Sequence, residues 1–334
     1  MTFDQITQDL KAKKYHPVYF LHGDESYYID LLAHQFEHQI LDEAERAFNL
    51  TILYGKEVDH KTVIDAARRF PMMAPHQVVI LKEAQSMKTI ADLSLYIENP
   101  SLSTLFIICY KHARFDKRTK FAKLIIKKAV IFESKRIYDN QIPAWINNYL
   151  QKKGLKINNK ETSLIGEYLG NNLNKIANEL DKLAINLTRG HQITQDDIEK
   201  YIGISKDYNI FELQNALGSR DREKTYRIIG YFQSNPKNNP LVMVVGTLFG
   251  FFAKIFQMHA LRNAGDREVQ KVLGLSTAYF VKDYRRAAQE YNKTQTEKVL
   301  NLLREYDLKS KGVERASATD QSLMQEMVYH ILSC

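Results

Sequence analysis

Five short apolar runs alternate with helix-forming stretches over the first part of the chain, and this alternation constrains the fold more than any other feature. Each run has the length and β-prone composition of a buried strand. The runs span 18–21, 48–54, 77–81, 104–110 and 129–132. Strands that alternate with helices form a mainly parallel sheet covered on both faces. The sequence therefore predicts an α/β domain at its beginning.

The first strand leads through a tight turn into a helix, which is how phosphate-binding α/β domains begin. Gly23-Asp24 is the turn, and Ser26 is the predicted N-cap of a helix that reaches about Leu41. A P-loop requires GxxxxGK[ST]. Here Asp24 and Glu25 follow Gly23, with neither a second glycine nor a Lys-Ser/Thr pair. Two carboxylates at this place would repel a nucleotide.

The end of the third strand lacks a second element of an ATPase. An ATPase carries acidic residues after this strand to hold Mg²⁺ and polarise water. In this chain Lys82-Glu83 stands there, and a lysine does not ligate a metal. We interpret Lys82 and Glu83 as ordinary surface charges. The sequence thus predicts an ATPase-type domain without an ATP site.

A helix beginning at the N-cap Asp59 runs toward a proline that precedes two methionines. Its predicted inner face consists of Val63, Ala66, Ala67 and Phe70. Pro71 disfavours helical geometry at the residue before it, so the helix is expected to end at Phe70. Met72 and Met73 follow. Methionine suits a surface that fits a partner's pocket, and it also fills cores, so both interpretations stay open.

Positive charge is concentrated in one window. The net charge is +8, from 47 basic and 39 acidic residues, and the window 111–136 holds ten Lys and Arg against two acids. A helix over 117–128 would turn Phe121, Leu124 and Ile125 inward. Its candidate DNA-contacting residues are Lys117, Arg118, Lys120, Lys123, Lys127 and Lys128. A solvated helix face is the commoner explanation, because no aromatic residues are interleaved for base stacking.

The rest of the chain is helical in pattern. The predicted domains are an α/β domain over 1–138, a small helical domain over 139–205 and an all-α domain over 206–334. Residues 241–253 are uncharged and contain Gly246-x-x-x-Gly250. This run is too short for a membrane span, so we expect a buried central helix whose glycines permit close helix packing.

Residues 266–287 have the pattern of a helix-turn-helix, with a glycine-containing turn and Arg285 and Arg286 in the second helix. Such corners also arise wherever two helices pack. No Ser/His/Asp, Cys/His or paired-carboxylate pattern indicates catalysis. The two cysteines, Cys109 and Cys334, support neither a disulfide framework nor a zinc site. We therefore expect a cytoplasmic chain without catalytic residues, cofactor or metal, and without an N-terminal signal peptide.

Five stretches together are similar to the delta subunit of the bacterial DNA polymerase III holoenzyme. They read VYFLHGDESYYID, ARRFPMMAPHQVVILKEA, LGNNLNKIANELDKLA, NIFELQNALGSRDREKTYRII and REYDLKSKG. They extend over nearly the whole chain in the family's order. The resemblance implies an ATPase-like (AAA+-type) α/β domain without a P-loop, a small helical domain and a C-terminal helical collar. Related clamp-loader subunits fit less well, since they typically carry a four-cysteine zinc site.

The resemblance also implies a function. In this family a hydrophobic wedge before the third strand inserts into the sliding clamp (the beta subunit) and opens the ring for loading onto primed DNA. The wedge falls on Phe70, Pro71, Met72 and Met73, where other members often carry Leu-Phe at the tip. Sister subunits bind and hydrolyse ATP. The chain would thus be a non-catalytic component of the polymerase holoenzyme, a nucleotidyltransferase.

The family's assembly is a heteropentamer joined through the collar, here residues 206–334, close to primed DNA and away from any membrane. The rival prediction is a DNA-binding regulator that uses 266–287 as a helix-turn-helix. An ATP-binding enzyme is the weakest prediction, because the motif around 23–30 lacks the P-loop lysine.

Overall fold

The computed structural model describes residues 1–112, 115–275, 280–313 and 317–334. The chain divides into two compact units, Met1–Ile137 and Tyr138–Cys334. Each unit is described here by itself. Whether the second unit divides again at 205/206 stays a prediction.

The first unit contains a five-stranded sheet in which all paired strands run parallel. The strand order is β2-β3-β4-β1-β5. The strands are β1 (Val18–Gly23), β2 (Leu50–Tyr54), β3 (Gln77–Lys82), β4 (Thr104–Lys111) and β5 (Val130–Ser134). The α/β sheet predicted from the alternating runs is therefore confirmed, and β2 is one of its two edges.

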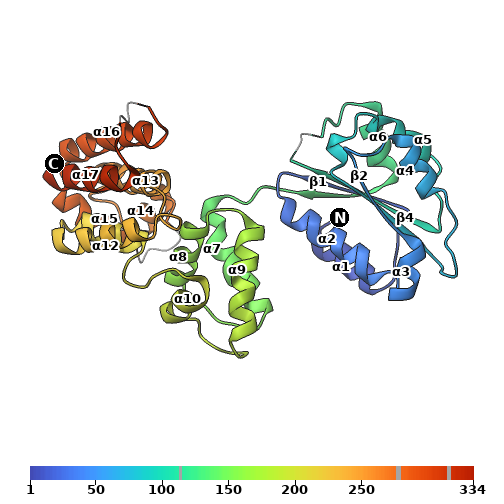
Figure 1. The fold of residues 1–334 in the computed structure, drawn as a ribbon, viewed down its shortest axis with the longest axis horizontal. Coiled ribbons are helices and arrows are strands. Elements are labelled where there is room, and N and C mark those ends of the chain that lie inside the picture. Colours follow the sequence, from blue (N-terminus) through green and yellow to red (C-terminus); the bar gives the residue numbers. More distant parts are fainter. Residues whose placement is uncertain (113–114, 276–279, 314–316) are drawn as a thin grey trace. The chain divides into compact units, whose positions relative to one another are not determined.

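Successive strand residues point to opposite faces of the sheet, and both faces are buried. Tyr19 and Leu21 pack with α1 (Phe3–Lys11) and α2 (Ser26–Gln39) on one face. Val18 and Phe20 pack on the other face. That face is covered by α4 (His60–Ala67), α5 (Ser94–Ile97) and α6 (Lys120–Lys128), with the 3₁₀ turns η1 (Ala84–Ser86) and η2 (Ile90–Leu93). Figure 1 shows the two groups of helices on opposite sides of the sheet.

Several local predictions for the first unit are wrong. The N-cap of α2 is Glu25, whose carboxylate accepts a hydrogen bond from the Tyr27 N–H, and Ser26 is the first helical residue. Residues 48 and 49 end a short helix, α3 (Glu43–Asn49), instead of opening β2. The predicted basic helix begins three residues late, after the N-cap Thr119. Between β3 and β4 the chain forms η2 and α5.

The second unit is built from helices, as predicted. Its helices are α7 (Ile142–Lys152), α8 (Asn159–Leu169), α9 (Leu173–Asn186), α10 (Gln195–Ile202), α11 (Ile210–Gly218), α12 (Arg222–Ser234), α13 (Leu241–Met258), α14 (Asp266–Leu273), α15 (Val281–Glu290), α16 (Lys293–Ser310) and α17 (Asp320–Ser333), with the turns η3 (Asp139–Gln141) and η4 (His259–Leu261). Thr194 caps α10 and forms a capping box with Asp197.

Helix α13 lies in the core of the second unit. Leu248, Phe252 and Ile255 are fully buried among α11, α12, α16 and α17. By length and composition, α13 and the turn that follows it could also cross a membrane, so the prediction that this stretch is too short for a span is wrong. Its buried, regularly spaced residues instead favour the core helix predicted from the sequence. The expected role of Gly246 and Gly250 is wrong, because both are exposed and a Cβ at either would meet no atom within 4 Å.

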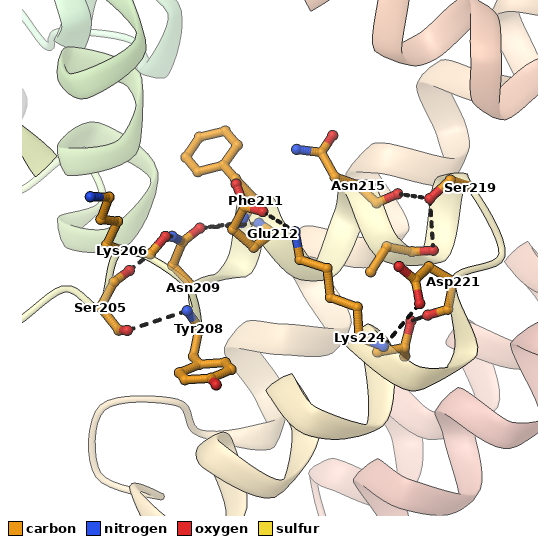
Figure 2. A network of polar contacts seen from close by, with 12 residues as sticks. Ser205, Lys206, Tyr208, Asn209, Phe211, Glu212, Asn215, Ser219, Asp221 and Lys224 are labelled. Atoms are coloured by element: carbon orange, nitrogen blue, oxygen red, sulfur yellow. Dashed lines mark hydrogen bonds and ion pairs between the residues drawn. The ribbon is translucent and has the colours of Figure 1, made fainter.

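The segment that leads into α11 and α12 is fixed by side-chain to backbone hydrogen bonds (Figure 2). Asn209 caps α11 by accepting from the N–H groups of Phe211 and Glu212. Its amide nitrogen donates to the carbonyl of Ser205 at 2.9 Å. Lys224 in α12 then pairs with Glu212 in α11. These contacts explain why NIFELQNALGSRDREK forms a helical hairpin.

Candidate functional site

The loop between α4 and β3 exposes a cluster of large apolar side chains. Phe70 is 86% exposed, Met72 60% and Met73 101%. Helix α4 ends at Ala67, three residues before the predicted end, so Phe70 lies outside the helix and points away from the core. The expectation that Phe70 packs inward is wrong. Of the two interpretations of Met72 and Met73, the structure favours the exposed surface over core filling.

Buried polar side chains fix the first end of this loop. The last carbonyls of a helix have no partner within the helix and need one elsewhere. Thr104 donates to the carbonyl of Ala67 at 2.9 Å. Gln77 donates to the carbonyls of Ala67 and Arg69 and to the Thr104 hydroxyl at 2.8 Å. Because Gln77 and Thr104 begin neighbouring strands, the sheet itself holds the exit of α4.

A second buried amide holds the tip of the loop. Asn49, 2% exposed, accepts from the Met72 N–H at 2.7 Å and donates to the Met72 carbonyl at 2.9 Å. Both backbone groups of Met72 are thereby satisfied by one side chain. Met73 follows in the left-handed region, at a φ of 53°. Residues other than glycine rarely adopt this region. The backbone therefore makes an unusual turn at Met73, the most exposed residue of the loop.

At the carboxyl end of β1, protein groups occupy the place where an ATPase would bind its nucleotide. The N-terminus of α2, where a phosphate would sit, already has the Glu25 carboxylate as its cap. Burial raises the pKa of Glu25, and the hydrogen bond from Tyr27 opposes that effect. Gly23 adopts a φ of 137°, and its Cα lies against the backbone of Ser134. The Glu25 N–H donates to the Ser134 carbonyl, so β5 closes this turn.

Glu83 is not the ordinary surface charge that we predicted. Its backbone is left-handed, with a φ of 52°, and its carboxylate lies 3.1 Å from Lys111 Nζ. Burial raises its pKa, but hydrogen bonds from Gln85 and Lys111 outweigh this and hold the pKa below its usual range. Lys82 pairs with Glu37 on α2 at 3.5 Å. Among the described residues no group of three or more His, Cys, Asp and Glu side chains could hold a metal ion.

The basic candidates divide into two sets. Lys117 pairs with Glu133 at 3.6 Å, and Arg118 pairs with Asp116 at 2.8 Å. The other four are exposed and form no ion pair with any described residue: Lys120, Lys123, Lys127 and Lys128. Ile125 is buried beneath them, with Phe121 and Leu124 half-buried, as the helical pattern predicted. Part of the basic window, 113–114, lies outside the described residues.

The candidate helix-turn-helix contains α14 and α15, but its arginines make contacts within the unit. Arg285 donates to the carbonyl of Ala264 at 2.7 Å and pairs with Asp266 at 3.0 Å. Arg286 lies 3.6 Å from Asp283. The turn residues 276–279 lie outside the described residues. Arg285 therefore ties α15 to the start of α14, which favours a packing corner over a base-reading helix.

Comparison with known proteins links this geometry to a family. Residues 19–135 match the family model described as "DNA polymerase III, delta subunit". The DNA polymerase III subunit delta of Bacillus subtilis is 25% identical over 267 residues, which cover 77% of this chain and 76% of that protein. This chain is similar to the DNA polymerase III delta subunits.

The solved structure of the Bacillus subtilis DNA clamp loader delta protein agrees with the relationship at the level of the fold. The match covers 99% of this chain and 100% of that protein, with a TM-score of 0.59 and 22% sequence identity. The resemblance and the fold class predicted from the sequence are thus confirmed.

The sequence analysis did not predict that Asn49 holds Met72 or that Lys111 pairs with Glu83. A signal for the first was present. Asp42 and Glu45 form a capping box, the hallmark of a helix start, just before the run that we took for a strand. Recognising α3 would have placed Asn49 at a helix end facing the loop before β3. No local pattern indicates the ion pair, because Lys111 and Glu83 come from segments that are distant in the sequence.

Proposed function

We propose that the chain is a clamp-loader subunit that binds a sliding clamp through Phe70, Pro71, Met72 and Met73 and opens the ring. The observation that carries this proposal is the exposure of three large apolar side chains on a loop fixed at its start and at its tip. A few apolar side chains buried in a partner's pocket can supply most of an interface's binding energy. A loop that is already ordered loses less entropy when it binds.

Opening requires more than binding. A ligand shifts a ring toward its open form only if it binds that form more tightly than the closed one. We propose that the wedge has this preference and that sister subunits supply ATP hydrolysis. The Glu25 cap on α2 and the missing P-loop lysine support a chain that hydrolyses no ATP itself.

The first experiment is binding of the purified chain to the sliding clamp of the same organism, measured for the wild type and for Met72→Ser/Met73→Ser. Because Asn49 holds Met72 through backbone atoms, the serine variant keeps the loop's hydrogen bonds and loses only the apolar tip. We expect the affinity to fall at least about a hundredfold, from the loss of two buried apolar side chains. The matched control is Leu95→Ser/Ile126→Ser, which removes two exposed apolar side chains from α5 and α6.

A second experiment separates opening from binding. Clamps closed on circular DNA should dissociate faster when the wild-type chain is added, and at the spontaneous rate when the serine variant is added. Tight binding without faster dissociation would contradict the opening step alone. Binding that the serine variant retains would move the wedge elsewhere.

The remaining parts of the proposal concern assembly. Residues 206–334 would join the other clamp-loader subunits in a heteropentamer in the cytoplasm, and the exposed lysines of α6 would lie toward primed DNA. The helix-turn-helix alternative has less support, since Arg285 is committed to Ala264 and Asp266.

A further inference from the structure

A fourth exposed apolar side chain comes from a different segment, directly before the residue that holds the wedge. Phe48 is 71% exposed, and its neighbour Asn49 is 2% exposed. They end helix α3, where consecutive residues point in directions about 100° apart. Asn49 therefore faces inward, and Phe48 faces solvent. Single exposed apolar residues are ordinary, but this one directly adjoins the residue that holds Met72.

The sheet brings the two segments to the same end of two neighbouring strands. β2 and β3 are parallel neighbours, with Leu50 in register with Val78. The residues that precede each strand, Phe48 in one and Met72 and Met73 in the other, therefore meet at the same end of the sheet. Asn49 fastens this arrangement. Besides its two bonds to Met72, its amide nitrogen donates to the carbonyl of Glu45 at 3.0 Å, which ties the tip of the loop to the last turn of α3.

The amide group makes this link specific. An N–H and a carbonyl of one residue are paired with the carbonyl oxygen and the nitrogen of the Asn49 side chain, as in the pairing of two strands. Buried backbone groups left without such partners are costly. Any change that removes the amide frees Met72 and lets the loop sample other conformations. Binding would then have to order it again, at the expense of affinity.

We infer that Phe48 is a further anchor for the sliding clamp and that Asn49 is the positioning residue which holds Met72 beside it. This inference rests on the proposed function and extends the clamp-facing surface beyond the loop before β3. Its occupant is the clamp's apolar pocket and rim. Phe48 contacts that partner directly, while Asn49 is buried and acts through the backbone of Met72.

The test compares clamp affinities of Phe48→Ser, Asn49→Ala and the wedge variant Met72→Ser/Met73→Ser, with Ile185→Ser as the matched control. Ile185 is a similarly exposed apolar residue of α9, in the second unit. Phe48→Ser should weaken clamp binding about tenfold or more, and Ile185→Ser should leave it unchanged. Because Phe48 is exposed, its variant should unfold at the wild-type temperature.

Positioning by Asn49 has its own readouts. In the free protein, the Met72 amide should exchange its hydrogen faster in Asn49→Ala than in the wild type, and at the wild-type rate in Phe48→Ser. Asn49→Ala should weaken clamp binding when Met72 and Met73 are present and have little effect once both are serine. Phe48→Ser should weaken binding in either background.

The outcomes distinguish this inference from the proposed function on which it rests. If the wild type binds the clamp and Phe48→Ser binds equally well, the anchor is overturned while the proposed function stands. If Asn49→Ala leaves both Met72 exchange and clamp affinity unchanged, the positioning role is overturned. A wild-type chain without affinity for the clamp overturns the proposed function, and this inference with it.

Discussion

Lys111, at the end of β4, lies between two carboxylates that come from separate elements, with its Nζ 2.5 Å from Asp30 Oδ1 on α2 and 3.1 Å from Glu83 Oε1 after β3. Burial lowers the pKa of Lys111, but the hydrogen bonds and charges of Asp30 and Glu83 outweigh this and raise it above its usual value. The lysine side chain is 12% exposed. One cation thus joins three segments at the carboxyl edge of the sheet.

Replacing this cation should destabilise the first unit. Lys111→Met keeps the volume but leaves Asp30 and Glu83 without their shared partner. Breaking a buried pair costs about 3–5 kcal/mol, and because both carboxylates here are partly exposed we expect about 1–2 kcal/mol. Urea unfolding measures the difference. Lys117→Met, which breaks an exposed pair, is the control and should change stability little; equal effects of the two would refute the special role of Lys111.

The chain should not bind ATP. The N-terminus of α2 is capped by Glu25, and the turn before it carries two carboxylates, so a triphosphate would meet negative charge and no free N–H cradle. Calorimetric titration with Mg·ATP at millimolar concentration should give no saturable heat. Saturable binding that Tyr27→Pro or Glu25→Ala alters would show a nucleotide site at this turn.

Gly23 should tolerate no side chain. A Cβ there would lie 2.0 Å from the Ser134 carbonyl oxygen, and its φ of 137° is strained for any L-residue. We expect Gly23→Ala to cost about 3 kcal/mol or more in unfolding free energy. Gly170→Ala is the matched control, because Gly170 also has a positive φ, 73°, but open space around it. It should cost only about 1 kcal/mol, and a similar loss for both would mean that the contact with Ser134 relaxes.

Stability should depend on His22 below neutral pH. Its side chain is buried beside Phe20 and Phe115, and desolvation lowers its pKa, with the Lys117 charge acting in the same direction and Glu133 opposing it. The unfolded chain therefore takes up a proton first, at a pKa of about 6.5. The stability that neutral His22 provides is present above that pH and is lost as the pH falls through it toward the folded-state pKa.

His22→Phe should remove this dependence. The difference in unfolding free energy between wild type and variant should be constant above about pH 7 and shift against the wild type below it. Nuclear magnetic resonance titration of the His22 ring reports the pKa directly. A ring that titrates at or above its usual value would contradict the prediction.

DNA binding distinguishes the exposed lysines from the arginines of α15. Replacing Lys120, Lys123, Lys127 and Lys128 by Gln should weaken binding to primed DNA. The plot of log K against log salt concentration should also become less steep, by up to about 0.9 in slope for each lost phosphate contact. Arg285→Ala/Arg286→Ala should leave both unchanged. The reverse result would favour the helix-turn-helix alternative.

The sheet was predictable from the sequence because both of its faces are buried, so each strand shows as a nearly continuous apolar run. The exposure of Met72 and Met73 was not predictable, since methionine serves equally in cores and on surfaces. The helix α3 was not predicted because the whole run FNLTILY is β-prone. The capping box at Asp42 instead starts a helix that includes the first two residues of this run, Phe48 and Asn49. The contacts of Asn49 and Lys111 depend on segments that only the fold brings together.

The side chain of Asn49 binds the main-chain N–H and carbonyl of Met72 and not the Met72 side chain. At residue 72 the path of the loop therefore does not depend on which side chain stands there. If the loop binds a partner as proposed, the side chain at position 72 can change to suit that partner while the hydrogen bonds from Asn49 stay the same. The arrangement thus separates two tasks: exposed side chains form the apolar surface, and a buried asparagine that is not part of that surface holds it in place.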